Sequence, residues 1–314
     1  MRIYFGINNI ISFIHSSKNN RQVFDDCLRM IKDNFSIHWC FKREEIDKLS
    51  KDDREDFNSW LRMMDSLSET PRWGDTVSYP INLLDWNLLT AIYCIDNVQQ
   101  NLGLIVAHLG EELDAISSLL FDGNQFTIDV FDDISKWSDL KTYSSPCTDM
   151  VIADPYVFSQ QELYKSNIYP FLQELCSKTD GRVNIVFFTR KEEQQPDWDK
   201  IYTEIRSNCV KSKQSPKPNV TFVIASKDVL AEHDRTFFTN YKVFVSGDTI
   251  NYFDASSNRI TTGRWLHIHS GASRRNERIA KKYIDDMQNI VNEIKRKNNP
   301  ALIIKDKKSN VIKF

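Results

Sequence analysis

No two cysteines of this sequence have the C-x-x-C spacing that zinc ligands and thiol redox centres commonly use. The six cysteines are widely scattered, and most of them lie in apolar stretches: Cys27, Cys40, Cys94, Cys147, Cys176 and Cys209. This distribution is typical of buried thiols in a reducing compartment. The cysteines therefore argue against a thiol-based metal or redox site.

The sequence also lacks a long apolar run near its start. Asn8, Asn9 and Ser12 interrupt the apolar residues that precede Lys18. This stretch is too short and too polar for a transmembrane span, and it has no signal-peptide cleavage pattern. We therefore expect a cytoplasmic protein.

A large net charge is absent as well. The formal charge of −2 gives no global attraction to nucleic acid or to a membrane, so any such binding needs a local basic patch. One local asymmetry exists, because residues 273–314 contain 12 Lys and Arg against 5 Asp and Glu. We interpret this segment as a solvated helix followed by a basic tail.

Two domains are expected, because a single core seldom extends beyond roughly 250–300 residues and the chain has 314. The loop-like segment Tyr143-Ser144-Ser145-Pro146 is the candidate boundary. We predict a helix-rich α+β domain of unknown role over residues 1–143 and a second domain over residues 144–314. Apolar periodicity in the first half predicts helices at residues 21–33, 43–67, 83–98 and 111–120, and strands at residues 2–7, 102–107 and 126–131.

Residues 5–12 loosely resemble the first strand of a PIN-type nuclease. Such a site needs an acidic residue at the strand end, because hard divalent cations prefer carboxylate oxygens. The sequence has Asn8 and Asn9 there instead, so we do not predict a nuclease site in the first half.

The second half alternates apolar strands with amphipathic helices. Buried strands are predicted at residues 150–153, 183–188 and 220–225, and helices at residues 167–178 and 197–209. Short strands without intervening helices follow, at residues 235–245, 249–253 and 265–268, before a closing helix at residues 273–296. The fold class expected is α/β, with a mixed sheet flanked by helices.

One constellation could bind phosphate. His233, Arg235 and Asn240 have the spacing H-x-R-x4-N at the start of a predicted strand. Phospholipase-D enzymes use H-x-K-x4-D, so an arginine replaces the lysine and an amide replaces the acid. Strand alternation places His233 and Arg235 on one face, where both could meet the same anion.

Asp154-Pro155-Tyr156 lies about eighty residues before this motif, and the two segments together carry a family resemblance over residues 149–297. They resemble the phospholipase-D-like C-terminal domain of the MIT-domain-containing protein 1 type. The resemblance implies a phospholipase-D-like fold, dimerisation and binding of acidic lipids without the full catalytic motif. The first half shows no three-helix MIT domain, so a partner of that domain is not carried over.

The candidate site residues follow from the motif, the resemblance and a helix start. The ligand-binding set is Arg235, Asn240, Asp154, Tyr156, Ser270 and Arg274, and His233 is catalytic only if the protein is an enzyme. Ser270 and Arg274 are included because free amides and arginines at a helix start attract anions. His267 and His269 alternate on one strand without a third ligand, so no metal site is predicted, and no cofactor is expected.

Three functions remain open. The first is a homodimeric, catalytically degenerate protein that binds a phosphate-containing ligand such as nucleic acid or an acidic lipid headgroup. The second is a dimeric phosphodiesterase or nuclease, such as a defence effector, with His233 as nucleophile. The third is a structural interaction protein whose contact surface includes Trp73, Trp86 and Trp137.

Overall fold

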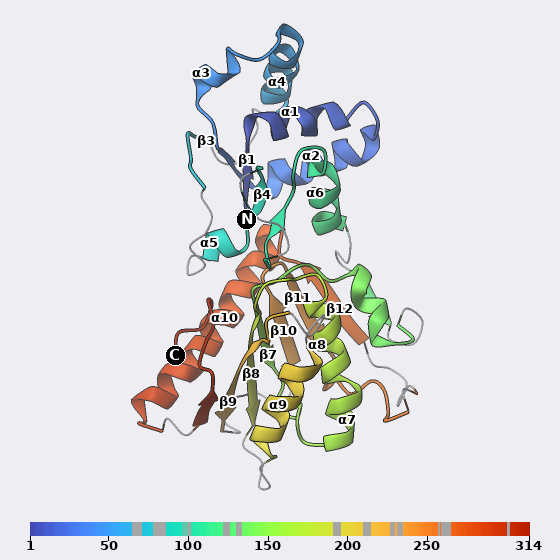
Figure 1. The fold of residues 1–314 in the computed structure, drawn as a ribbon, viewed down its shortest axis with the longest axis vertical. Coiled ribbons are helices and arrows are strands. Elements are labelled where there is room, and N and C mark those ends of the chain that lie inside the picture. Colours follow the sequence, from blue (N-terminus) through green and yellow to red (C-terminus); the bar gives the residue numbers. More distant parts are fainter. Residues whose placement is uncertain are drawn as a thin grey trace.

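The chain forms two α/β units that are joined end to end along the long axis of the molecule (Figure 1). The computed structural model describes residues 1–64, 71–77, 86–96, 98, 102–121, 126–129, 134–190, 196–209, 215–226, 230, 235–256, 258, 265–299 and 302–314. The α/β class expected from the sequence is confirmed.

The first unit is built on a parallel sheet. Five strands within the described residues have the order β3-β2-β1-β4-β5, and every pair is parallel. The strands are β1 (Arg2–Phe5), β2 (Ser36–Trp39), β3 (Arg72–Trp73), β4 (Ile92–Cys94) and β5 (Ile105–Val106). The chain runs outward from β1 to one side and then returns to β4 on the other side. The strand order therefore reverses between β1 and β4, which makes this position a topological switch point.

Helices surround this sheet: α1 (Ile7–Ser16), α2 (Arg21–Asn34), α3 (Arg43–Ile46), α4 (Lys51–Met63), α5 (Trp86–Leu89) and α6 (Glu112–Phe121). The apolar faces of α1, α2, α3, α4 and α6 join the strands in one core around Phe5, Phe13 and Trp39, whereas Trp86 of α5 packs against a core cluster of the second unit. The helix predicted at residues 43–67 is two helices, and Ser50 caps the second through the N–H of Asp53 (3.1 Å). The helix predicted at residues 83–98 is wrong for its second half, which is strand β4.

The second unit contains a mixed sheet, which has the order β13-β9-β8-β7-β10-β11-β12-β6 among the described strands. These are β6 (Phe126–Asp129), β7 (Asp149–Ala153), β8 (Asn184–Arg190), β9 (Asn219–Ala225), β10 (Arg235–Thr239), β11 (Lys242–Ser246), β12 (Trp265–Ser270) and β13 (Ile303–Lys305). Strands β7, β8 and β9 are parallel, and β10, β11 and β12 follow as antiparallel neighbours.

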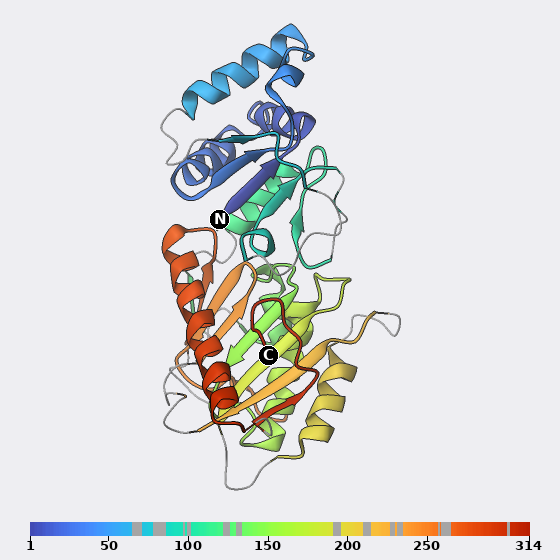
Figure 2. The same ribbon diagram turned by 90° about the vertical axis from the view of Figure 1, so that its left-hand side faces the viewer.

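Helices cover both faces of the second sheet (Figure 2). They are α7 (Gln161–Ser166), α8 (Ile168–Cys176), α9 (Trp198–Asn208) and α10 (Arg274–Arg296), with a 3-10 helix η1 at Trp137–Thr142. Phe187 and Phe222 turn toward α8 and α9, whereas Val186 and Val223 turn toward α10. Because both faces are covered, the central strands are apolar along their whole length.

The two sheets divide the chain earlier than the boundary predicted at residue 143. Strand β6 pairs with β12 and therefore belongs to the second sheet. Trp137 is 4% exposed and packs against Phe171 and Tyr252, so its predicted place on a contact surface is wrong. The unit boundary in the structure lies between α6 and β6.

The predicted basic tail is folded onto the sheet. Strand β13 pairs with β9, and the carboxylate of Asp149 accepts hydrogen bonds from the hydroxyl of Ser309, the N–H of Asn310 and the side-chain amide of Asn310 (2.7–2.8 Å). Ile312 lies in the core beneath α10. The segment therefore forms an integral edge of the second unit.

Candidate functional site

Three predicted site residues gather at the carboxyl end of β7. Asp154 follows this strand directly, and Arg235 begins the neighbouring strand β10. Thr249 links them, because its hydroxyl accepts from Arg235 Nε (3.1 Å) and donates to Asp154 Oδ1 (3.1 Å). Tyr156 also contacts Asp154, because its backbone N–H donates to Asp154 Oδ1 (2.9 Å). The structure thus brings Asp154, Tyr156 and Arg235 together.

Asp154 is completely buried, which is unusual for a carboxyl group. Burial raises the pKa of Asp154 to about 6, and the N–H of Tyr156 and the nearby Arg235 guanidinium offset part of that rise. The second oxygen accepts from the N–H of Ile250 (3.4 Å). The group is therefore held by hydrogen bonds at a site where ionisation is costly.

A second arginine, absent from the sequence prediction, joins this cluster. Arg190 ends strand β8 and donates from Nη1 to the hydroxyl of Tyr156 (3.1 Å). The guanidinium carbons of Arg190 and Arg235 lie 5.8 Å and 5.9 Å from the centre of the Tyr156 ring. Arg235 Nη2 also lies 3.6 Å from Asp248 Oδ1. We call Asp154, Tyr156, Arg190 and Arg235 the arginine pair site.

His233, the predicted nucleophile, lies outside the described residues. The shared anion pocket of His233 and Arg235 therefore stays a prediction. Arg235 itself is only 11% exposed at its side chain, and its described contacts are polar or aromatic.

The structure does not bring Asn240 to this cluster, which corrects the prediction. Arg235 and Asn240 stand at opposite ends of β10, roughly 16 Å apart along an extended strand. The Asn240 carbonyl oxygen accepts from the N–H groups of Thr148 (2.8 Å) and Asp149 (3.2 Å), and its amide donates to the carbonyl of Leu89 (3.0 Å). Asn240 is therefore a buried structural residue between the two units.

Ser270 and Arg274 also lie at that far end. Ser270 is fully buried, and its hydroxyl donates to the carbonyl of Leu119 in the first unit (2.8 Å). The backbone N–H of Arg274 donates to Asn34 Oδ1 (3.2 Å) at the end of α2. The start of α10 thus packs against the first unit, and these two residues form no common site with Arg235.

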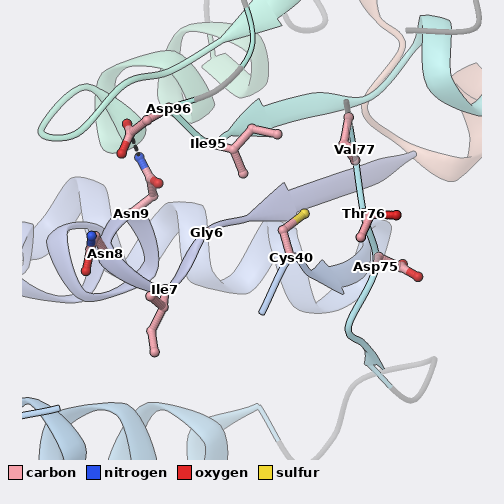
Figure 3. A pocket seen from close by; sticks show the side chains of 10 residues that line it. All are labelled: Gly6, Ile7, Asn8, Asn9, Cys40, Asp75, Thr76, Val77, Ile95 and Asp96. Carbon is pink, nitrogen blue, oxygen red and sulfur yellow. Dashed lines mark hydrogen bonds between the residues drawn. The ribbon is translucent and has the colours of Figure 1, made fainter. Parts of the chain in front are cut away.

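A separate pocket, which the sequence interpretation missed, lies at the carboxyl edge of the first sheet. Its volume is about 300 Å³, and it sits at the switch point between β1 and β4 (Figure 3). The lining residues come from the ends of β1, β2, β3 and β4 and from the start of α1: Gly6, Ile7, Asn8, Asn9, Cys40, Asp75, Thr76, Val77, Ile95 and Asp96. We call this cavity the switch-point pocket.

A buried carboxylate holds one lining side chain in place. Glu112 at the start of α6 is 1% exposed and accepts hydrogen bonds from Asn9 Nδ2 (3.0 Å), the hydroxyl of Ser12 (2.9 Å) and the N–H of Gly110 (3.0 Å). Burial raises the pKa of Glu112, and these donors offset part of that rise. Asn9 Nδ2 also donates to Asp96 Oδ1 (3.3 Å), as Figure 3 shows.

The opposite end of the switch-point pocket contains Asp75 and Cys40. Asp75 accepts a hydrogen bond from Nδ1 of the buried His38, whose ring lies against Tyr4. Burial lowers the pKa of His38 despite this carboxylate. Burial raises the pKa of the Cys40 thiol to about 12, so Cys40 is not a reactive thiolate at neutral pH.

Comparisons with known proteins add no function. No protein-family model matches the chain, and no curated protein matches its sequence. In the part of the chain that the structure describes, no three His, Cys, Asp or Glu side chains are arranged to hold a metal ion. None of the described helices combines the length and apolar character needed to cross a bilayer.

Proposed function

We propose that the protein binds a phosphate-containing ligand at the arginine pair site of the second unit. The supporting observation is the convergence of two guanidinium groups on the ring of Tyr156. Arg190 ends β8 and Arg235 begins β10, on the two sides of β7. Ligands in α/β sheets commonly bind beyond the carboxyl ends of the parallel strands, which is where this pair lies.

The charges around the pair favour an anion. Arg235 faces Asp248 and the buried Asp154, whose pKa of about 6 leaves it partly protonated near neutral pH, and Arg190 adds a second permanent positive charge beside Tyr156. Guanidinium groups bind phosphate oxygens in a fork geometry, and partial burial strengthens such charge-assisted hydrogen bonds. A phosphate monoester and a phosphodiester present the same oxygens, so the shared ligand chemistry is the phosphoryl group.

Calorimetric titration with inorganic phosphate tests the proposal directly. We expect Arg190→Ala and Arg235→Ala each to weaken binding at least 10-fold, because each removes a charge-assisted contact of about 1.5–3 kcal/mol. Arg182→Ala is the matched control, because Arg182 is exposed in the turn before β8. Equal phosphate affinity in all four proteins would contradict the proposal.

Further titrations identify the source of the phosphoryl group. A single-stranded oligonucleotide and vesicles containing an acidic phospholipid are compared, each with Arg190→Ala as the control. Hydrolysis of bis(p-nitrophenyl) phosphate that disappears in His233→Ala would instead make the protein a phosphodiesterase. The predicted homodimer is checked by sedimentation of the same samples.

A further inference from the structure

We propose that the switch-point pocket is a second ligand site, which takes a ribose-bearing mononucleotide. The phosphate would lie at the start of α1, and the ribose hydroxyls would donate to the carboxylates that line the pocket. This site lies in a different unit from the arginine pair site, so the inference does not depend on the proposed function.

The first argument is the exposed start of α1. Gly6 precedes this ten-residue helix without a side-chain cap, and the first turn contains no acidic residue. The first N–H groups of a helix have no partner within the helix and attract anions. Thus Gly6, Ile7 and Asn8 bring an uncapped helix start to the pocket. The first turn itself contains no acidic residue, and the nearby carboxylates of Asp96 and Glu112 are held by Asn9 Nδ2.

The second argument is the fixed orientation of Asn9, which is 2% exposed. Its Nδ2 donates to the carboxylates of Asp96 and Glu112, and this choice settles which side-chain atom is the nitrogen. Its Oδ1 accepts no hydrogen bond from any described residue, although Asn9 lines the pocket. This oxygen is open to the pocket rather than sealed, so a ligand hydroxyl or amino group could donate to it there.

Gly6 supports this arrangement. A Cβ atom built on Gly6 would lie 2.8 Å from Asn9 Oδ1, closer than real Cβ atoms approach an oxygen. The φ of Gly6 is −74°, so backbone conformation does not require glycine here. The close approach of Asn9 Oδ1 to Gly6 does require glycine, because any larger residue would displace this oxygen, which belongs to a lining residue of the pocket.

The third argument concerns charge and size. Asp75 and Asp96 line the pocket, whereas no Lys or Arg does among the described lining residues. Carboxylates accept from ribose hydroxyls, and Asp75 is separated from α1 by two strand spacings, roughly 10 Å, so the ribose would lie between the start of α1 and Asp75. A volume of about 300 Å³ is at the lower end for ligand sites, which suits one nucleotide rather than a dinucleotide.

The test is calorimetric titration of the full chain with AMP, ribose 5-phosphate and inorganic phosphate, all with EDTA present. We expect AMP and ribose 5-phosphate to bind, and Asn9→Ala to weaken both by about 10-fold or more. Asp75→Asn and Asp96→Asn are expected to weaken both about 5- to 10-fold. Because the Asp75 and Asp96 side chains are 35% and 51% exposed, these two variants should keep the fold even if Asn9→Ala does not.

Asn19→Ala is the matched control, because Asn19 is exposed in the turn after α1. Arg235→Ala should leave AMP binding in this pocket unchanged, so failure here and failure at the arginine pair site are distinguishable. Three results would overturn the inference: no AMP binding at millimolar concentration, AMP binding that the three pocket variants leave intact, or phosphate alone binding as tightly as AMP.

Discussion

Replacing Asp154 by Asn is expected to remove a pH-dependent loss of stability. Burial raises the pKa of Asp154 in the folded protein to about 6, from an ordinary value of 3.8. The folded protein therefore holds this proton more tightly than the unfolded chain does. The contribution of Asp154 to stability is greatest below pH 4 and is lost as the pH rises through about 6.

The magnitude follows from the two pKa values. They differ by about two, and each pKa unit corresponds to about 1.4 kcal/mol, so the contribution is about 3 kcal/mol. Because the carboxyl is fully buried, solvent screening reduces this figure little. In Asp154→Asn the new amide does not titrate, so the free energy of unfolding of the wild type should fall by about 3 kcal/mol relative to the variant between pH 4 and pH 7.

Urea unfolding followed by tryptophan fluorescence at several pH values measures this difference. Other buried carboxyls, such as Glu112, titrate in both proteins and cancel. The amide introduced by the substitution would face the N–H of Ile250, which adds a constant offset that does not affect the pH dependence. Arg235→Ala should extend the loss of stability to higher pH, because Arg235 lowers the pKa of Asp154. A difference that stays constant within about 0.5 kcal/mol would refute the reasoning.

Three further substitutions test the packing between and within the units. Tyr241→Phe should cost about 2–4 kcal/mol in urea unfolding, because the hydroxyl of Tyr241 pairs a buried N–H and a buried carbonyl of the first unit. Gly103→Ala should lower the melting temperature far more than Gly110→Ala. Both glycines have positive φ, but only at Gly103 would the new Cβ lie 2.6 Å from the backbone of Cys147. Asp149→Ala should make the C-terminal segment sensitive to limited proteolysis, because three hydrogen bonds to that segment are lost.

The second sheet was largely predictable from the sequence. The strands predicted at residues 183–188 and 220–225 correspond to β8 and β9, with boundaries that differ by one or two residues. Helices cover both faces of these strands, so their sequences are continuous apolar runs bounded by polar loops. Such runs are the clearest strand signal that a single sequence offers.

The first sheet was not predictable in the same way. Strand β4 is three residues long and follows the short helix α5, so the apolar residues of both merge into one pattern that resembles a longer helix. Strand β2 has four residues, and its order in the sheet depends on pairing with distant segments. The switch-point pocket was missed for this reason, because four separate strand ends form it.

The spacing of the motif also predicted one membership of the candidate site wrongly. The short motif predicts that Arg235 and Asn240 lie together, but a strand extends about 3.3 Å per residue and separates its ends. Arg190 was missed for the opposite reason. It lies 45 residues before Arg235 in the sequence, yet the sheet order β8-β7-β10 brings both beside Tyr156.

The two proposed sites face away from each other. Tyr241 and Asn240, in the turn between β10 and β11, hydrogen bond to the chain just before β4 and at the start of β5. The amino group of Met1, which precedes β1, forms an ion pair with Glu277 of α10 (2.8 Å). The amino ends of the parallel strands of both sheets therefore meet at the junction between the units, and the carboxyl ends point outward. A switch-point ligand and a ligand at the arginine pair site would be separated by the lengths of both sheets, roughly 25 Å or more. At such a distance substitutions usually act additively, so coupled binding would have to pass through the contacts of the Asn240–Tyr241 turn.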